Sequence, residues 1–178
     1  GQRWSAANAY LKPAIKNQGV RLFKGALVDK INFTNGRANS VTFRRGGQTI
    51  TAHAKQEIIL AAGAINSPQI LQRSGIGPGQ VLQQAGVDVI ADRPRVGANL
   101  QDHLEVYFQV RCLQPVTLNK HVNLLSKGMI GLRWMLNRSG LGASNQFETL
   151  GFIRSDKGIS YPDIQFHFLP AAIRYDGK

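Results

Sequence analysis

Residues 55–77 read KQEIILAAGAINSPQILQRSGIG, and this segment carries the clearest structural signals in the chain. Its apolar run 58–62 is short enough to be a fully buried strand. Gly63 and Ala64 follow the run, and their small side chains let another group approach the backbone closely. We therefore expect a buried strand that ends in a turn accessible to a ligand.

A helix is expected immediately after this turn. Ser67 is a suitable N-cap and Pro68 a suitable first helical residue, while Ile70 and Leu71 supply a buried face. The glycine- and proline-rich segment 74–79 ends the helix. A strand, a small-residue turn and a capped helix form a place where a cofactor can meet the backbone, although an ordinary αβ unit without a ligand would have the same pattern.

The same segment resembles the second signature of the glucose–methanol–choline (GMC) flavoprotein oxidoreductases. Further similarity, to the choline-oxidising members of that family, extends over nearly the whole chain. The matching signature residues are Gly63, Ala64, Ser67, Pro68, Ile70, Leu71, Ser74, Gly75, Ile76 and Gly77. The further matches are residues 96–97, 99–107, 142–148 and 166–170.

The resemblance implies an α/β fold of mixed α+β character in two parts. Residues 1–100 would form the rear part of an FAD-binding Rossmann-like domain with a β-meander, and residues 101–178 part of an antiparallel-sheet substrate-binding domain. The family's G-x-G-x-x-G fingerprint is absent, because Gly75 and Gly77 follow a helix and Gln80 stands at the third glycine position. The family's catalytic histidine near the C-terminus is absent too. We therefore expect an internal fragment that contains no catalytic residue and is inactive by itself.

Other elements follow from periodicity and turn residues. Residues 20–54 alternate in hydrophobicity and contain the hairpin signals Asn35-Gly36 and Arg45-Gly46-Gly47, which predicts the meander. Residues 119–137 have apolar residues at helical spacing, which favours a surface helix packed by one face over a helix bound at a membrane. The remaining expected elements are helices at 1–16 and 78–85 and strands at 87–90, 105–111, 147–153 and 164–169.

Composition argues against several classes of protein. The chain of 178 residues has a net charge of +12, but its basic residues are scattered singly without interleaved aromatics, so we expect no nucleic-acid binding. No apolar run approaches the roughly 18 residues needed to span a bilayer. The single cysteine, Cys112, precludes an internal disulfide and suits a reducing compartment. The four histidines form no metal-binding pattern, so no metal is expected.

The resemblance implies FAD as the cofactor, with Val28, Ala61, Ala62 and Gly63 as cofactor-binding residues. Val28 lies where the family uses a strand backbone to contact the flavin adenine. Residues 61–63 lie where the chain passes close to the ribose and the diphosphate. Such backbone contacts require small neighbours, which these residues supply. Taken alone, Val28 would be interpreted as a core strand valine.

Glu105 is the first expected substrate-binding residue. On base rates a strand glutamate is a solvated surface residue, and the alternative is a buried carboxylate with a cationic partner. Choline carries a fixed positive charge, so its site needs a permanent anion and aromatic walls. The choline-oxidising members have a glutamate two residues after the histidine of an Asp-His pair, which here is Asp102-His103. This match favours the functional interpretation.

His167 is the second expected substrate-binding residue. Strand alternation would bury Phe166 and Phe168 on one face and leave His167 on the other. By resemblance it lies near the place where choline-oxidising members have a histidine close to the substrate hydroxyl. The alternative is a structural histidine, and its spacing from His103 is longer than in the oxidases.

The function implied by the resemblance is FAD-dependent oxidation of choline to betaine aldehyde, by hydride transfer to the flavin, in glycine betaine synthesis. The partners would be choline or a similar alcohol and an electron acceptor. The alternatives are a GMC enzyme acting on another primary alcohol and a non-catalytic binding module of the same fold. We expect a cytoplasmic location, with peripheral association of the full-length enzyme with the inner membrane left open.

Overall fold

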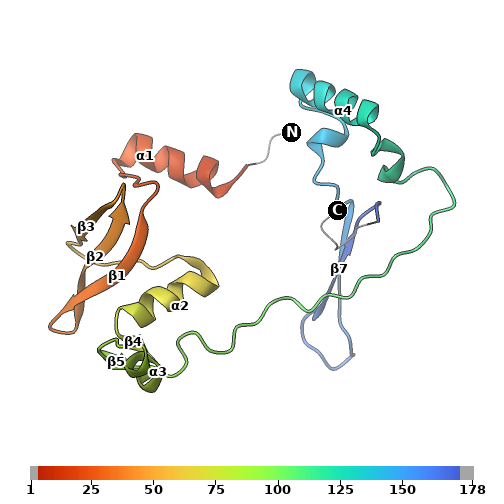
Figure 1. The fold of residues 1–178 in the computed structure, drawn as a ribbon. Coiled ribbons are helices and arrows are strands. Elements are labelled where there is room, and N and C mark those ends of the chain that lie inside the picture. The colour runs from red at the N-terminus through yellow and green to blue at the C-terminus, as the bar shows by residue number, and fades with distance from the viewer. Residues whose placement is uncertain (1–3, 173–178) are drawn as a thin grey trace. The chain divides into compact units, whose positions relative to one another are not determined.

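The computed structural model describes residues 4–172, which fall into two compact units. The first, called here the meander unit, comprises residues 15–104. The second, called the hairpin unit, comprises the described residues before 15 and after 104. Residues 101–112, drawn in green in Figure 1, contain neither helix nor strand. Among the described residues, no helix is long and apolar enough to cross a membrane.

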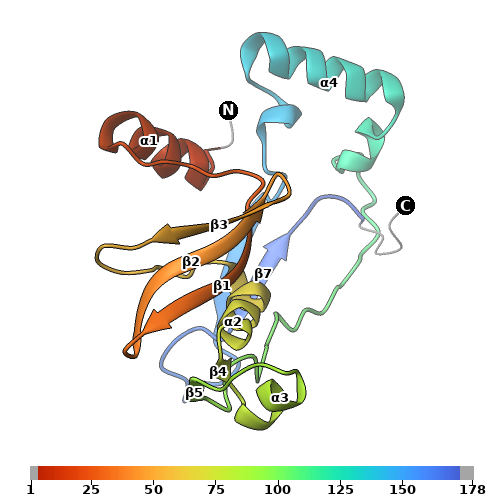
Figure 2. The same cartoon turned by 60° about the vertical axis from the view of Figure 1, so that its left-hand side comes forward.

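The meander unit is built on a three-stranded antiparallel sheet of β1 (Leu27–Thr34), β2 (Arg37–Arg45) and β3 (Gln48–His53), in that order (Figure 2). Two-residue turns at 35–36 and 46–47 connect the strands, and both residues of each turn have positive φ. Asn-Gly and Gly-Gly suit such turns, because their twist matches that of the flanking strands. The predicted meander is confirmed, with Ile31 and Phe43 buried on it.

Helix α2 (Gly63–Arg73) packs against β1, and α3 (Gly79–Gln84) follows it. Between and after them, β4 (Ile76–Gly77) pairs in parallel with β5 (Ala91–Asp92). Gly75 ends α2 with a φ of +84°, and a Cβ there would lie 2.5 Å from the carbonyl oxygen of Asp88. Only glycine fits such a crossing, which explains the sharp end predicted for this helix.

The hairpin unit contains helix α4 (Leu124–Asn137) and the antiparallel hairpin of β6 (Thr149–Ile153) and β7 (Ile164–Phe168). The Asn123 side chain caps α4 by accepting the backbone N–H of Ser126. The predicted helix and the two predicted strands are confirmed, with α4 beginning a few residues later than expected. The expected packing of the helix by one face is wrong, because α4 has no buried residue and its apolar residues Leu125 and Met129 are 83% and 72% exposed. The shorter elements are η1 (Ala7–Leu11), α1 (Lys12–Gln18), η2 (Leu118–His121) and η3 (Leu141–Ala143), and α1 crosses from one unit to the other.

The predicted strand at 58–62 is wrong. The segment has no strand partner among the described residues, and Ile59 is 80% exposed. An extended segment becomes a strand only where a neighbour exchanges backbone hydrogen bonds with it. The helix also begins earlier than predicted: Gly63 is its first residue, and Pro68 lies inside it.

Two further strand predictions are wrong for the same reason. Residues 105–111 alternate in character but have no paired neighbour in the described part of the chain, and Phe108 is 83% exposed. The strand expected at 87–90 lies instead at Ala91–Asp92, where β4 is available to pair with it.

Candidate functional site

The first candidate site lies at the beginning of α2. Gly63 opens the helix with a φ of +87°, and no heavy atom lies within 4 Å of the position that a Cβ would occupy. The backbone N–H of Ala62 donates to the hydroxyl of Ser67 at 3.0 Å, so Ser67 stabilises this turn from inside the helix rather than as its predicted N-cap. The next N–H groups of a first turn have no acceptors within the helix, and the helix dipole adds partial positive charge there.

This arrangement fits a diphosphate. Ala61 is exposed, Ala62 is half-buried, and neither has a side chain that would obstruct a ligand at the turn. Open space beside a glycine, combined with a helix N-terminus, is a favourable environment for an anionic group. Ala61, Ala62 and Gly63 therefore have the surroundings that a dinucleotide cofactor requires, and their role in binding FAD stays a prediction.

Val28, the other predicted cofactor residue, lies half-buried on β1. Its carbonyl oxygen accepts a hydrogen bond of 2.7 Å from the guanidinium of Arg73 at the end of α2. The pairing of β1 with β2 slips between Val28 and Lys30, so the strand bulges at this point. Because β1 and α2 are in contact, the structure brings together the two elements that carry the predicted cofactor residues.

Ser74 has a structural role that its place at the helix end and in the family signature does not reveal. It is 4% exposed, and its hydroxyl accepts the backbone N–H of Ile31 at 2.8 Å. The same hydroxyl donates to the carbonyl of Ile70 at 2.5 Å. Nothing local in the sequence indicates a hydrogen bond between residues 31 and 74. The available signal was the serine placed directly before the glycine that ends the helix.

Glu105 lies in the irregular segment at the start of the hairpin unit, and its side chain is exposed. The phenol O–H of Tyr107 donates to the Oε2 atom of Glu105. These two side chains therefore face the same way, although they do not lie on a strand. A carboxylate beside an aromatic ring is the combination that recognises a quaternary ammonium group.

His167 lies on β7 opposite Leu150 of β6. The ring of Phe147 meets its imidazole edge to face, with centroids 5.7 Å apart and an interplanar angle of 72°. Among the described residues, the contacts of Glu105 and His167 are with these different partners, Tyr107 and Phe147, and do not join the two residues. Their common role in substrate binding stays a prediction.

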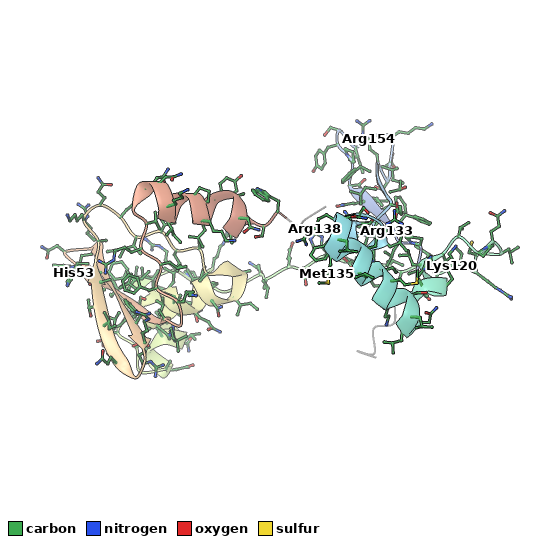
Figure 3. The ribbon with its side chains drawn as sticks, turned by 90° about the horizontal axis from the view of Figure 1, so that it is seen from above. His53, Lys120, Arg133, Met135, Arg138 and Arg154 are labelled. Carbon is green, nitrogen blue, oxygen red and sulfur yellow. The ribbon has the colours of Figure 1, made fainter. Side chains whose placement is uncertain are left out.

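The labelled basic side chains of the hairpin unit serve local structure (Figure 3). Lys120 donates to the carbonyl of Pro115 at 2.8 Å, Arg133 to the hydroxyl of Ser139 at 3.3 Å and Arg154 to the carbonyl of Ser160 at 3.2 Å. The guanidinium of Arg138 lies 4.3 Å from the ring centroid of Trp134. Residues 4–172 contain no group of three or more histidine, cysteine, aspartate or glutamate side chains that could hold a metal ion.

Curated relatives match the chain over its full length. Oxygen-dependent choline dehydrogenases of Brucella canis and Photobacterium profundum are 55% and 52% identical to it over 178 residues, which is 100% of this chain but 32% and 31% of those proteins. The chain therefore spans about a third of the length of the curated relatives it matches.

Solved structures show the same fold. An FAD-dependent oxidoreductase from Chaetomium thermophilum is 29% identical, with a TM-score of 0.65 over 82% of this chain and 26% of that one. A formate oxidase variant from Aspergillus oryzae has a TM-score of 0.71 over 81% of this chain and 30% of that one, at 22% identity, and is similar in fold alone. The mixed α/β fold expected from the sequence is thus confirmed.

Residues 1–105 match the family described as GMC oxidoreductase, which is more than half of the chain. This region includes the turn at Gly63, the Arg73–Val28 bond and Glu105. The chain belongs to the GMC oxidoreductase family.

Proposed function

We propose that this chain is part of an FAD-dependent enzyme that oxidises choline to betaine aldehyde. Relatives with more than half of their aligned residues identical are oxygen-dependent choline dehydrogenases. Those names describe the relatives, and the chain covers about a third of their length. The support from this molecule itself is the pairing of Glu105 with Tyr107.

The Glu105–Tyr107 pair is the feature that favours choline over a neutral alcohol as the substrate. A trimethylammonium group has no hydrogen-bond donor, so a protein can hold it only through charge and through contact with aromatic faces. Glu105 supplies a full negative charge, and the Tyr107 O–H orients that carboxylate. A neutral primary alcohol, the substrate of the alternative GMC enzyme, would have no use for an anion at this position.

Ala61, Ala62, Gly63 and Val28 would hold FAD through the open turn of α2 and the strand backbone of β1. When bound, FAD supplies the acceptor for the hydride of the alcohol, and a separate electron acceptor then takes the electrons. A non-catalytic binding module of the same fold is the third possibility. It would keep these backbone contacts but would not reduce flavin when choline is added.

The substitution Glu105→Gln in the full-length enzyme tests the proposal, because it keeps the shape of the side chain and removes its charge. At about 4 Å and an effective dielectric constant near 20, the attraction is on the order of 4 kcal/mol before desolvation. If about half survives, choline binding should weaken roughly thirtyfold. The measurement is choline affinity by flavin reduction at increasing substrate concentration.

Two controls make this experiment specific. The neutral isostere 3,3-dimethylbutan-1-ol should bind nearly equally well before and after the substitution. Asp156→Asn removes the same charge from an exposed loop of the hairpin unit and should leave choline binding unchanged. Equal weakening of both alcohols by Glu105→Gln, or no weakening of either, would contradict a choline-binding role for Glu105.

We also propose that the enzyme works in the cytoplasm, with peripheral association of the full-length enzyme with the inner membrane left open. The single cysteine, Cys112, is compatible with a reducing compartment. Cell fractionation is the measurement: the enzyme should be recovered from the cytoplasmic side, and recovery in an extracytoplasmic fraction would contradict the proposal.

A further inference from the structure

Two consecutive residues at the C-terminal end of α2, Arg73 and Ser74, form hydrogen bonds to the backbone of the outer edge strand of the meander. Strand β1 is an edge strand, because its sheet has the order β1-β2-β3. The carbonyl of Val28 accepts from Arg73, and the N–H of Ile31 donates to Ser74. A strand edge that would otherwise face solvent or another chain is thus partly satisfied by the neighbouring helix.

The two bonds differ in kind. The Ser74 hydroxyl is buried, and with the adjacent Ile70 it holds the helix against the strand. Arg73 is exposed and reaches back from the helix surface to a single carbonyl. The Ser74 bond therefore lies inside the packed contact between α2 and β1, whereas the Arg73 bond lies at its exposed surface.

The position of the Arg73 bond suggests what it does. Val28 is the strand residue predicted to contact the adenine, and Gly63, predicted to contact the diphosphate, begins the helix that Arg73 ends. Adenine and diphosphate are covalently joined in one dinucleotide, so the strand and the helix must keep a constant spacing. A carbonyl oxygen has two lone pairs, which means that Val28 can accept from Arg73 and from an adenine amino group together.

We propose that Arg73 is a positioning residue for the adenine end of the flavin cofactor. Its guanidinium holds the Val28 carbonyl in place and ties β1 to the helix that begins at the diphosphate turn. This inference rests on the proposed FAD-binding function. It assigns to Arg73 no contact with the reacting atoms of the substrate.

The test uses the full-length enzyme freed of flavin and the variants Arg73→Ala and Arg73→Lys. Each is titrated with FAD, with ADP, which contains the adenine end alone, and with FMN, which lacks it. Arg73→Ala should weaken FAD and ADP about tenfold, the scale of one charge-assisted hydrogen bond, and leave FMN unchanged. Arg73→Lys should recover part of the loss, since an ammonium group can still donate to the carbonyl.

Arg37→Ala is the matched control. Arg37 also donates from an exposed guanidinium to a backbone carbonyl of the meander unit, that of Gln56 at 2.8 Å, but away from Val28. This variant should bind FAD like the wild type. If Arg73→Ala also behaved like the wild type, or weakened FMN as much as ADP, the inference would be overturned while FAD binding itself stood. A wild-type enzyme that bound no FAD would overturn the proposed function and the inference together.

Discussion

The hydroxyl of Ser74 accepts the backbone N–H of Ile31 at 2.8 Å, and both residues are buried. The same hydroxyl donates to the carbonyl of Ile70 at 2.5 Å. One side chain therefore satisfies an edge-strand donor and a carbonyl near the end of a helix, and it joins two segments separated by 43 positions in the sequence.

Ser74→Ala should destabilise the meander unit by about 1–3 kcal/mol, because the buried N–H of Ile31 would lose its acceptor. Hydrogen exchange of the β1 amides in the enzyme measures this loss locally. Ser160→Ala, at an exposed position, is the control and should change stability by less than about 0.5 kcal/mol. Unchanged exchange at Ile31 in the Ser74 variant would show that this hydrogen bond contributes nothing.

Three glycine-to-alanine substitutions should fall in a definite order of thermal stability. Gly75→Ala should be the most harmful, because its Cβ would lie 2.5 Å from the Asp88 carbonyl at a φ of +84°. Gly36→Ala meets no atom within 4 Å and should cost only the left-handed conformation, about 1–2 kcal/mol. Gly128→Ala lies in open space in α4 and should stabilise the helix by up to about 1 kcal/mol. A Gly75→Ala variant that melted at or above the temperature of either other variant would contradict the packing at Gly75.

Gly63→Val in the full-length enzyme should strongly reduce the flavin bound per protein molecule. Its side chain would fill the open space at the start of α2 that we assign to the cofactor. Gly36→Val is matched to it, since it has a similar φ of +73° and open surroundings but lies in the turn between β1 and β2. Flavin absorbance relative to protein distinguishes the two. Normal flavin content in the soluble part of the Gly63 variant would indicate a purely structural glycine.

Acid should weaken the β6–β7 hairpin through Asp163. The hydroxyl of Ser155 donates to the Asp163 carboxylate at 2.5 Å and its backbone N–H at 2.7 Å, and these bonds lower the pKa of Asp163. The folded pKa is then below the unfolded value of about 3.9, so the contribution to stability is complete above that pH and is lost as pH falls through the folded pKa.

An NMR titration of the Asp163 carboxyl checks this effect. Ser155→Ala removes the hydroxyl donor and should raise the pKa of Asp163 toward its ordinary range. Ser160→Ala, a second serine in the same loop region, should leave it where it was. An Asp163 pKa that is the same in the wild type and in Ser155→Ala would contradict the assigned cause.

Much of the fold was predictable, because its signals are local. The turns at 35–36 and 46–47 and the alternation of the strands between them specify the meander register. The end of α2 follows from glycines that tolerate positive φ and close backbone approach.

The two strands predicted at 58–62 and 105–111 are not formed, because local sequence signals do not specify a pairing partner. Segment 58–62 has the apolar composition of a buried strand and segment 105–111 has strand-like alternation. A strand nevertheless exists only where a second segment supplies hydrogen-bond partners. The division of the chain into compact units also depends on contacts between residues distant in the sequence. The chain was expected to divide into domains after residue 100, and its two compact units are residues 15–104 and the remaining described residues. Whether these units are the FAD-binding and substrate-binding domains stays a prediction.

The sequence by itself determined the family, the turns of the meander, the C-terminal end of α2 and the candidate residues Val28, Gly63, Glu105 and His167. Only the tertiary structure decided that the end of α2 bonds to the edge of β1 through Arg73 and Ser74. The physical reason is that these bonds join backbone groups of β1 to side chains more than forty residues away. A backbone N–H or carbonyl is the same in every residue that has one, so no residue type in the sequence marks which of them a distant side chain will reach.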